Sequence, residues 1–206
     1  MIVDLTHEIT DGMPVYPGDS ETRLAQTRFL TQDSHSNYEL SINMHTGTHI
    51  DGPRHMLDTP AYLNDFPLES FIGEGCLIDV SREPDVIRYR QEYEQMMAEK
   101  QIVLFHTGHS KYFGEPTYFD KHPVLDLAVA ELIVRSKVKM IGLDTPSPDR
   151  YPFAVHKHLL EHGVLILENL ARLDQLLTAK SFEVIALPLN VKADSSIARV
   201  VARVKV

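Results

Sequence analysis

Apolar and polar residues alternate along much of the first third of the chain. Residues 23–30 and 37–44 follow the two-residue period of a strand, with Tyr38, Leu40 and Ile42 on one face of the second segment. Short apolar runs bounded by turn residues predict further strands. We expect these strands over residues 1–5, 71–81, 102–105, 138–143, 164–167, 182–191 and 197–205.

Apolar residues at helical spacing predict helices over residues 84–99, 125–136 and 154–162, and Gly163 is a typical stop signal for the last of these. A short helix is expected over 169–177. Strands dominate the first half, and strands alternate with helices in the middle. This order predicts the α/β class with a mixed β-sheet. Since no linker or internal repeat divides the chain, we expect a single domain over residues 1–206.

Composition and charge narrow the classes of function. The formal net charge is −9, and no basic run offsets it, which argues against a nucleic-acid partner. No segment approaches the roughly 18 apolar residues of a membrane helix, and the N-terminus does not resemble a signal peptide. The one cysteine, Cys76, excludes an internal disulfide and is expected to be a small buried strand residue. These features indicate a cytoplasmic protein.

Candidate chemistry is concentrated in His45-Thr-Gly-Thr-His49-Ile-Asp51-Gly-Pro-Arg-His55. The three histidines and the aspartate all occupy odd positions, so in an extended backbone their side chains would face one point. Gly47, the β-branched threonines and the following Asp-Gly-Pro argue against a helix. The segment therefore predicts an extended loop that gathers metal ligands.

Two residues far along the chain complete a candidate ligand set. His156 lies in the predicted helix 154–162, and Glu168 directly follows the apolar strand 164–167. Burying a carboxylate in that position costs free energy unless a positively charged group pairs with it, and a metal ion would do so. Imidazole and carboxylate ligands suit Zn²⁺ and also Mn²⁺ or Fe. Asp51 and Glu168 could each bridge two ions, so one or two ions per subunit are expected.

Other histidines and aromatic residues are less specific. His106 and His109 flank a Thr-Gly turn at the end of a strand, where they either line a pocket or cap the loop. Tyr16 lies in a loop rich in Pro and Gly and is either a packing residue or part of a pocket wall. The remaining histidines are expected to be ordinary core or surface residues: His7, His35, His122, His158 and His162.

Several motifs, taken together and in order, resemble one known family over nearly the full length of the chain. The most specific is His45-x-x-x-His49-x-Asp51-x-Pro53-x-His55. It resembles the signature of the metal-dependent cyclase/hydrolase family, which includes bacterial kynurenine formamidase and isatin hydrolase. The supporting motifs are Asp4-Leu-Thr-His7, Tyr16-Pro-Gly-Asp19, Thr107-Gly108, Gly142-Leu-Asp144-Thr-Pro-Ser147, Glu168-Asn-Leu170 and Leu187-Pro-Leu189.

The resemblance implies a swivelling β/β/α fold, assembled as a homodimer or higher oligomer. It implies that the ligands of the metal are His45, His49, Asp51, His156 and Glu168, and that His55 is the catalytic proton donor and acceptor. Isatin hydrolase is similar but carries Gln where this chain has Glu168. Kynurenine formamidases commonly have a Trp that stacks on the substrate where this chain has Tyr16, which assigns Tyr16 to substrate binding. His109 also replaces a Trp that often follows the Thr-Gly.

The expected activity is that of a metal-dependent hydrolase acting on a C–N bond of a small molecule. The first hypothesis is hydrolysis of N-formyl-L-kynurenine to L-kynurenine and formate, by water activated at the metal with His55 as proton shuttle. Tyr16 and His109 motivate a second hypothesis, in which the substrate is a cyclic amide such as isatin, a lactone or another carbonyl compound. A third is a metal-stabilised protein without enzymatic activity.

Overall fold

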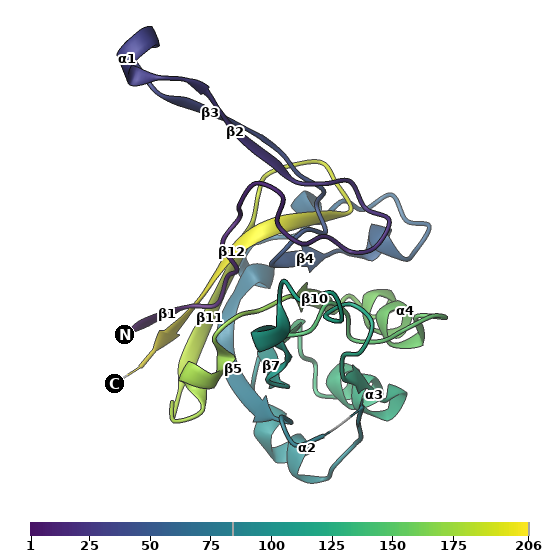
Figure 1. Ribbon diagram of the computed structural model, residues 1–206. Helices are drawn as coiled ribbons and strands as arrows, with labels where there is room; N and C mark the ends of the chain where they lie inside the picture. Colours follow the sequence, from purple (N-terminus) through teal and green to yellow (C-terminus); the bar gives the residue numbers. More distant parts are fainter. Residues whose placement is uncertain (84, 206) are drawn as a thin grey trace.

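The computed structural model, which describes residues 1–83 and 85–205, is organised around an eight-stranded β-sheet (Figure 1). In spatial order its strands are β1 (Ile2–Asp4), β12 (Ser195–Val204), β11 (Phe182–Pro188), β5 (Ile72–Asp79), β7 (Ile102–His106), β9 (Met140–Leu143), β10 (Leu165–Glu168) and β4 (His49–Asp51). β5, β7, β9 and β10 are parallel neighbours, and all the other pairs are antiparallel. The predicted α/β class with a mixed sheet is confirmed.

The sheet closes on itself at β4. This strand pairs with β10 on one side and with the first residues of β12 on the other, so seven strands form a ring and β1 is added to the far part of β12. Closure leaves the interior of the ring as one apolar core. Ile50, Leu104, Leu167 and Val200 are among its fully buried members.

A second apolar core lies between the outer face of the parallel strands and the helices. Successive residues of β7 belong to the two cores in turn. Ile102 and Leu104 face the interior of the ring, while Val103 and Phe105 face the helices. Parallel strands covered on both faces have continuous apolar sequences, which is why residues 102–105 form an unbroken run. The helices are α2 (Glu92–Met97), α3 (Leu127–Arg135) and α4 (Ala154–Glu161).

Local signals define the ends of these helices. Asp126 precedes α3, and its side chain accepts a hydrogen bond from the backbone N–H of Ala128, as an N-cap residue does. Gly163 follows α4 with a φ of 74°, the left-handed conformation that glycine adopts readily at a helix C-terminus. The predicted helix over 154–162 is therefore confirmed to within one residue.

Two predicted helices are wrong in part. The helix expected over 84–99 includes residue 84, which lies outside the described residues. Of the rest, only α2 is helical, and Val86–Ile87 form the short strand β6, which pairs in parallel with β8 (Val124–Leu125). Burial of Ile87 in the outer core outweighs the helical spacing. The segment 169–177 contains only a 3₁₀ turn at Leu173–Leu176. Further 3₁₀ turns cover Pro53–His55, Leu63–Asp65, Leu68–Phe71 and His109–Tyr112.

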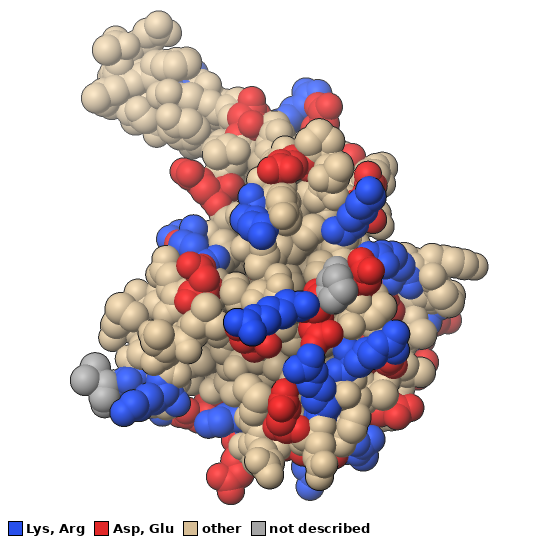
Figure 2. All heavy atoms as spheres, turned by 60° about the horizontal axis from the view of Figure 1, so that its bottom comes forward, with Lys and Arg blue, Asp and Glu red and all other residues tan. Residues whose placement is uncertain are grey.

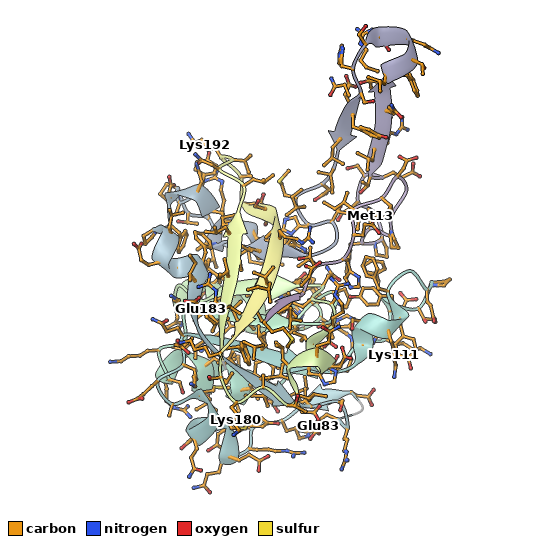
Figure 3. The ribbon with its side chains drawn as sticks, turned by 90° about the vertical axis from the view of Figure 1, so that its left-hand side faces the viewer. Met13, Glu83, Lys111, Lys180, Glu183 and Lys192 are labelled. Atoms are coloured by element: carbon orange, nitrogen blue, oxygen red, sulfur yellow. The ribbon has the colours of Figure 1, made fainter. Side chains whose placement is uncertain are left out.

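A long hairpin extends away from the body of the molecule (Figures 1 and 3). It consists of β2 (Arg23–Arg28), the single turn α1 (Leu30–Asp33) and β3 (Asn37–Ser41), and we call it the arm. The alternating pattern predicted these strands correctly. Every residue of β3 is exposed, so the apolar side chains of this alternating pattern do not pack against the body.

Within residues 1–83 and 85–205, no helix is both long and apolar enough to cross a membrane. Cys76 lies in β5 and is partly buried rather than fully buried, and burial raises the pKa of its thiol to about 12.

The contact between Gly75 and Phe182 gives a test of the interior core. The two residues are paired in the β5–β11 ladder, and the Phe182 ring covers the glycine. A Cβ at residue 75 would lie 2.9 Å from Phe182 Cδ2 and 3.0 Å from Val184 Cγ2. Gly75→Ala is expected to lower the free energy of unfolding by about 1–3 kcal/mol through overpacking. Urea unfolding measures this, with the exposed Thr178→Ala as a control. Equal midpoints for wild type and Gly75→Ala would contradict the packing described.

Candidate active site

The pairing of β4 with β10 brings together residues from the two ends of the predicted ligand set. In this antiparallel ladder Glu168 is opposite His49, so their side chains lie on the same face of the sheet. Ile50, between His49 and Asp51, points to the opposite face and is buried in the interior core. As a result His49 Nε2 lies 3.3 Å from Glu168 Oε2 and 3.4 Å from Asp51 Oδ1. All three side chains are nearly or fully buried.

The other edge of β4 adds polar residues from the start of β12. Ser195 is paired with Asp51, and its hydroxyl donates a hydrogen bond of 3.2 Å to Asp51 Oδ1. The carboxylate of the preceding Asp194 lies 2.9 Å from His45 Nε2. His45 Nδ1 lies 3.0 Å from Asp51 Oδ1, so this histidine bridges two carboxylates.

A sharp turn returns the chain from His45 to His49. Gly47 adopts a φ of 61° in this turn, and a Cβ there would lie 2.8 Å from the terminal methyl of the buried Met13. Met13 is in the segment that leads into the arm (Figure 3). Glycine is therefore favoured at residue 47 both by conformation and by space. The predicted convergence of the odd-numbered residues is observed, but only residues 49–51 are extended.

His156 reaches the same point from the first turn of α4. Its Nε2 lies 3.1 Å from Glu168 Oε1 and 3.8 Å from Asp51 Oδ2. Its Nδ1 lies 2.5 Å from Asp149 Oδ1. Five predicted ligands, His45, His49, Asp51, His156 and Glu168, are thus gathered in one place.

His55 stands at the outer side of this group. It lies on the 3₁₀ turn after β4, with its ring centroid 4.2 Å from that of His45, and its Nδ1 is 3.6 Å from Asp194 Oδ2. Its side chain is 25% exposed, against 1% for His49 and 3% for His156. Solvent and a substrate can therefore reach His55 and, to a similar extent, His45 at 20% exposure, whereas His49 and His156 are enclosed.

Carboxylates around the imidazoles favour their charged forms. Burial lowers the pKa of His45, but hydrogen bonds to Asp194 and Asp51 outweigh it and raise the pKa to about 9. Burial likewise lowers the pKa of His156, but hydrogen bonds to Asp149 and Glu168 outweigh it and raise the pKa to about 10. The site therefore attracts positive charge.

The carboxylates are held ionised by the same contacts. Burial raises the pKa of Asp51, but the charge of His49 and the hydrogen bond from His45 outweigh it and lower the pKa well below the ordinary value. Burial and the charge of Asp51 raise the pKa of Glu168, whereas the hydrogen bond from His156 and the charge of His49 lower it further than these raise it. Two buried, ionised carboxylates in one site require cations between them.

The residues present fit a divalent metal ion. His49 Nε2 and Asp51 Oδ2 are buried and make no hydrogen bond, and both are aimed at the centre of the group. Ligand atoms about 2.0–2.1 Å from a tetrahedral ion are roughly 3.3–3.4 Å apart. The observed separations of His49 Nε2 from Asp51 Oδ1 and Glu168 Oε2, 3.4 and 3.3 Å, match this spacing. Asp51 belongs both to a cluster with His45 and His49 and to one with His55 and His156, which suits a bridging carboxylate.

A cleft of about 190 Å³ opens beside the site. His45, His55, His156 and Glu168 form its polar wall. Tyr16 is one of its aromatic lining residues, and its ring meets that of Phe119 edge-on at 5.6 Å. Tyr16 thus lines the cleft that these residues face.

The histidines left open by the sequence lie elsewhere. His109 is buried, stacks on Tyr118 and bonds the carbonyl of that residue through Nε2, so it caps the loop and does not line the cleft. His106 bonds Asp79 beside a separate hollow. A hollow of about 520 Å³ lies around Asp4 and Arg199, whose side chains form an ion pair.

Sequence reasoning missed Asp149, Asp194 and Ser195. The spacing Ser147-Pro-Asp149 before a helix is a weak capping signal that could have suggested Asp149. No local signal marks Asp194 and Ser195, because they meet His45 only through the pairing of β12 with β4.

Comparisons with known proteins agree with this geometry. The chain is 29% identical to a kynurenine formamidase of Bacillus mycoides over 206 residues, which covers 98% of this chain and 96% of that protein. A solved structure described as a potential metal-dependent hydrolase with cyclase activity superposes with a TM-score of 0.82 at 27% identity, covering 98% and 96% of the two chains. Isatin hydrolase A from Labrenzia aggregata superposes with a TM-score of 0.82 at 25% identity, covering 99% and 93%.

The sequence model of the Cyclase family, described as "Putative cyclase", matches residues 3–150 and includes the whole histidine motif. The resemblance found in the sequence is thereby confirmed, and this chain belongs to the Cyclase family of metal-dependent hydrolases.

Proposed function

We propose that this protein is a metal-dependent amidohydrolase that converts N-formyl-L-kynurenine to L-kynurenine and formate. The observation that carries the proposal is the convergence of buried imidazoles and carboxylates, with orphaned atoms on His49 and Asp51, beside a cleft that His55 also lines. The formamidase name of relatives that align over 96% of their length supports the choice of substrate.

The residues that would hold the metal are His45, His49, Asp51, His156 and Glu168, with Zn²⁺ as the proposed ion, one or two per subunit, and Mn²⁺ as the alternative. A bound divalent cation supplies Lewis-acid chemistry, which lowers the pKa of water and polarises a carbonyl. Asp51, placed between the two histidine clusters, is the proposed bridging ligand if two ions bind.

His55 moves protons in this scheme. As water attacks the formyl carbon, His55 takes a proton from that water, and it then gives the proton to the aniline nitrogen as the C–N bond breaks. Asp194, 3.6 Å from His55 Nδ1, stabilises the imidazolium between these two transfers and leaves the other ring nitrogen to face the substrate. Hydrogen bonds with His45 and His55 lower the pKa of Asp194, so it stays ionised throughout.

The cleft suits an aryl formamide. Tyr16, Phe119 and Phe153 line it, and aromatic faces bind an aryl ring by stacking or edge contacts. The smaller tyrosine, in place of the tryptophan common in kynurenine formamidases, also favours a second candidate substrate, a cyclic amide such as isatin. The likeness to isatin hydrolase A supports this alternative.

Steady-state kinetics with the zinc-loaded protein separate the two candidates. We expect kcat/KM for N-formyl-L-kynurenine to exceed that for isatin and for simple lactones at least tenfold. A preference for isatin of the same size would replace the first candidate with the second. No turnover of any of these compounds would rule out both candidates and leave another carbonyl substrate or the non-enzymatic hypothesis.

Two histidine variants test the division between metal ligands and proton shuttle. His55→Ala is expected to keep its metal but to lose turnover by about 10²–10⁴-fold, because only proton transfer is removed. His49→Ala is expected to lose both, since the carboxylates of Asp51 and Glu168 then face each other without that imidazole. Elemental analysis and the formamidase assay measure this, with the exposed His162→Ala as control. A His55→Ala protein that binds metal and keeps full activity would contradict the assignment of His55 as the proton shuttle.

We also propose that the protein forms a homodimer and that the arm is the contact. The arm exposes large apolar side chains, with Leu30 at 67% and Tyr38 at 59% exposure. Residues 21–41 contain no lysine, and Asp33, the one charged residue in 29–38, pairs with Arg28 at the base of the turn. In Figure 2 the outer part of the arm is almost free of charged atoms, unlike the body.

A second copy is the partner that best fits this surface. An isolated two-stranded hairpin is marginally stable in water, so the arm requires a surface to pack against. Strand edges without lysine or proline readily pair with other chains. Two identical arms related by a two-fold axis cover each other's apolar side chains and strand edges in a closed assembly. Two-fold symmetry is the commonest symmetry of homo-oligomers.

Light scattering after size exclusion tests the dimer. The wild type is expected at twice the chain mass of 23.4 kDa, and Leu30→Glu with Leu40→Glu at the monomer mass. Leu68→Glu is the matched control, because Leu68 is as exposed as Leu30 but lies on the body. A monomeric wild type, or a double variant that remains dimeric, would each rule out the arm as the contact.

A further inference from the structure

Asp149 is a buried carboxylate whose two oxygens have separate partners. Oδ2 accepts hydrogen bonds from the backbone N–H groups of Val155 and His156, at 2.6 and 3.3 Å, in the first turn of α4. Oδ1 lies 2.5 Å from the ring atom Nδ1 of His156. One residue therefore fixes both the start of the helix and the ring that the helix carries.

The contact at Oδ1 defines which nitrogen of His156 can bind a metal. An ionised carboxylate only accepts hydrogen bonds, so Nδ1 must carry the hydrogen that it donates to Asp149. Nε2 is then the nitrogen that faces Glu168 and Asp51, at 3.1 and 3.8 Å. Rotation of the ring by half a turn would break the bond to Asp149 and turn Nε2 away from the site.

The surroundings hold Asp149 itself in place. Its backbone N–H donates to Ser147 Oγ at 3.3 Å, and its carbonyl accepts from the same hydroxyl at 2.7 Å. Only 7% of Asp149 is exposed, so water does not compete for its oxygens. Ser147 lines the cleft, whereas Asp149 does not. Asp149 thus acts on the site through His156.

We infer that Asp149 is a positioning residue that holds His156 with Nδ1 protonated and Nε2 aimed at the metal. The inference rests on the proposed metal site, to which it adds a residue that touches neither metal nor substrate. Carboxylates that bind the outer nitrogen of a metal-ligating histidine fix its tautomer and increase its basicity, and their loss commonly weakens metal binding about 10–100-fold.

The first experiment measures zinc affinity by competition with a chelator, using the full chain. Asp149→Asn is expected to weaken zinc binding about 10–100-fold, because the amide keeps the shape but not the charge. Asp144→Asn is the matched control. Asp144 is also buried and accepts three hydrogen bonds from Thr107 and Gly108, but it contacts no proposed ligand. Thermal unfolding of the metal-free proteins measures the structural cost of each change.

A double-mutant cycle shows whether Asp149 acts through His156. In a His156→Gln background, Asp149→Asn is expected to have little further effect on zinc affinity. Equal weakening in both backgrounds would mean that Asp149 is only a helix cap, and it would overturn the inference. If His156→Gln alone left zinc affinity unchanged, the proposed ligand set would be wrong, so the two failures are distinguishable.

A measurement on the wild type covers the case in which Asp149→Asn does not fold. Nitrogen NMR of the zinc-loaded protein reports which ring nitrogen carries hydrogen, and the signal of His156 is the one that disappears in His156→Gln. We expect hydrogen on Nδ1 and zinc on Nε2. The opposite assignment would overturn the inference without any variant at residue 149.

Discussion

The register of β4 between β10 and β12 is the constraint on which the site depends. β4 has only three residues, and both of its edges are paired. Ile50 is fully buried in the interior core, which fixes the face that His49 and Asp51 present. A slip of one residue would place Ile50 in the site and both polar side chains in the apolar core. Burial of one isoleucine thus specifies the positions of two proposed ligands.

Closure of the sheet also explains why the site draws on both ends of the chain. Glu168 ends a parallel strand, and ligand sites in α/β proteins commonly lie at the carboxyl ends of such strands. β4 joins that edge to the start of β12, so Asp194 and Ser195 meet a motif that lies about 150 residues earlier in the sequence. Strand pairing therefore brings Glu168, Asp194 and Ser195 to the histidine motif, and helix α4 contributes His156.

Charge balance links this architecture to chemistry. Buried carboxylates are stable only beside positive charge. Here imidazoles lie beside the carboxylates, at the place where a metal ion would also bind. His55 and His45 are the more exposed imidazoles, at 25% and 20%, and both line the cleft. The same gradient of burial that makes the inner groups suitable as ligands leaves His55 accessible for proton transfer.

The sequence alone predicted the class of fold, the positions of most strands along the chain and the six residues proposed for metal binding and proton transfer. It could do so because strand and helix periods are local, and because four of those six residues lie close together in the chain, between His45 and His55. Tertiary structure decided the rest. Whether residues 86–87 join a helix or a strand depends on a partner at residues 124–125, and the exposure of the arm depends on what lies beside it. Asp149, Asp194 and Ser195 acquire their contacts only when helix α4 and strand β12 are placed. Such contacts join residues that are distant in sequence, and no local pattern encodes them.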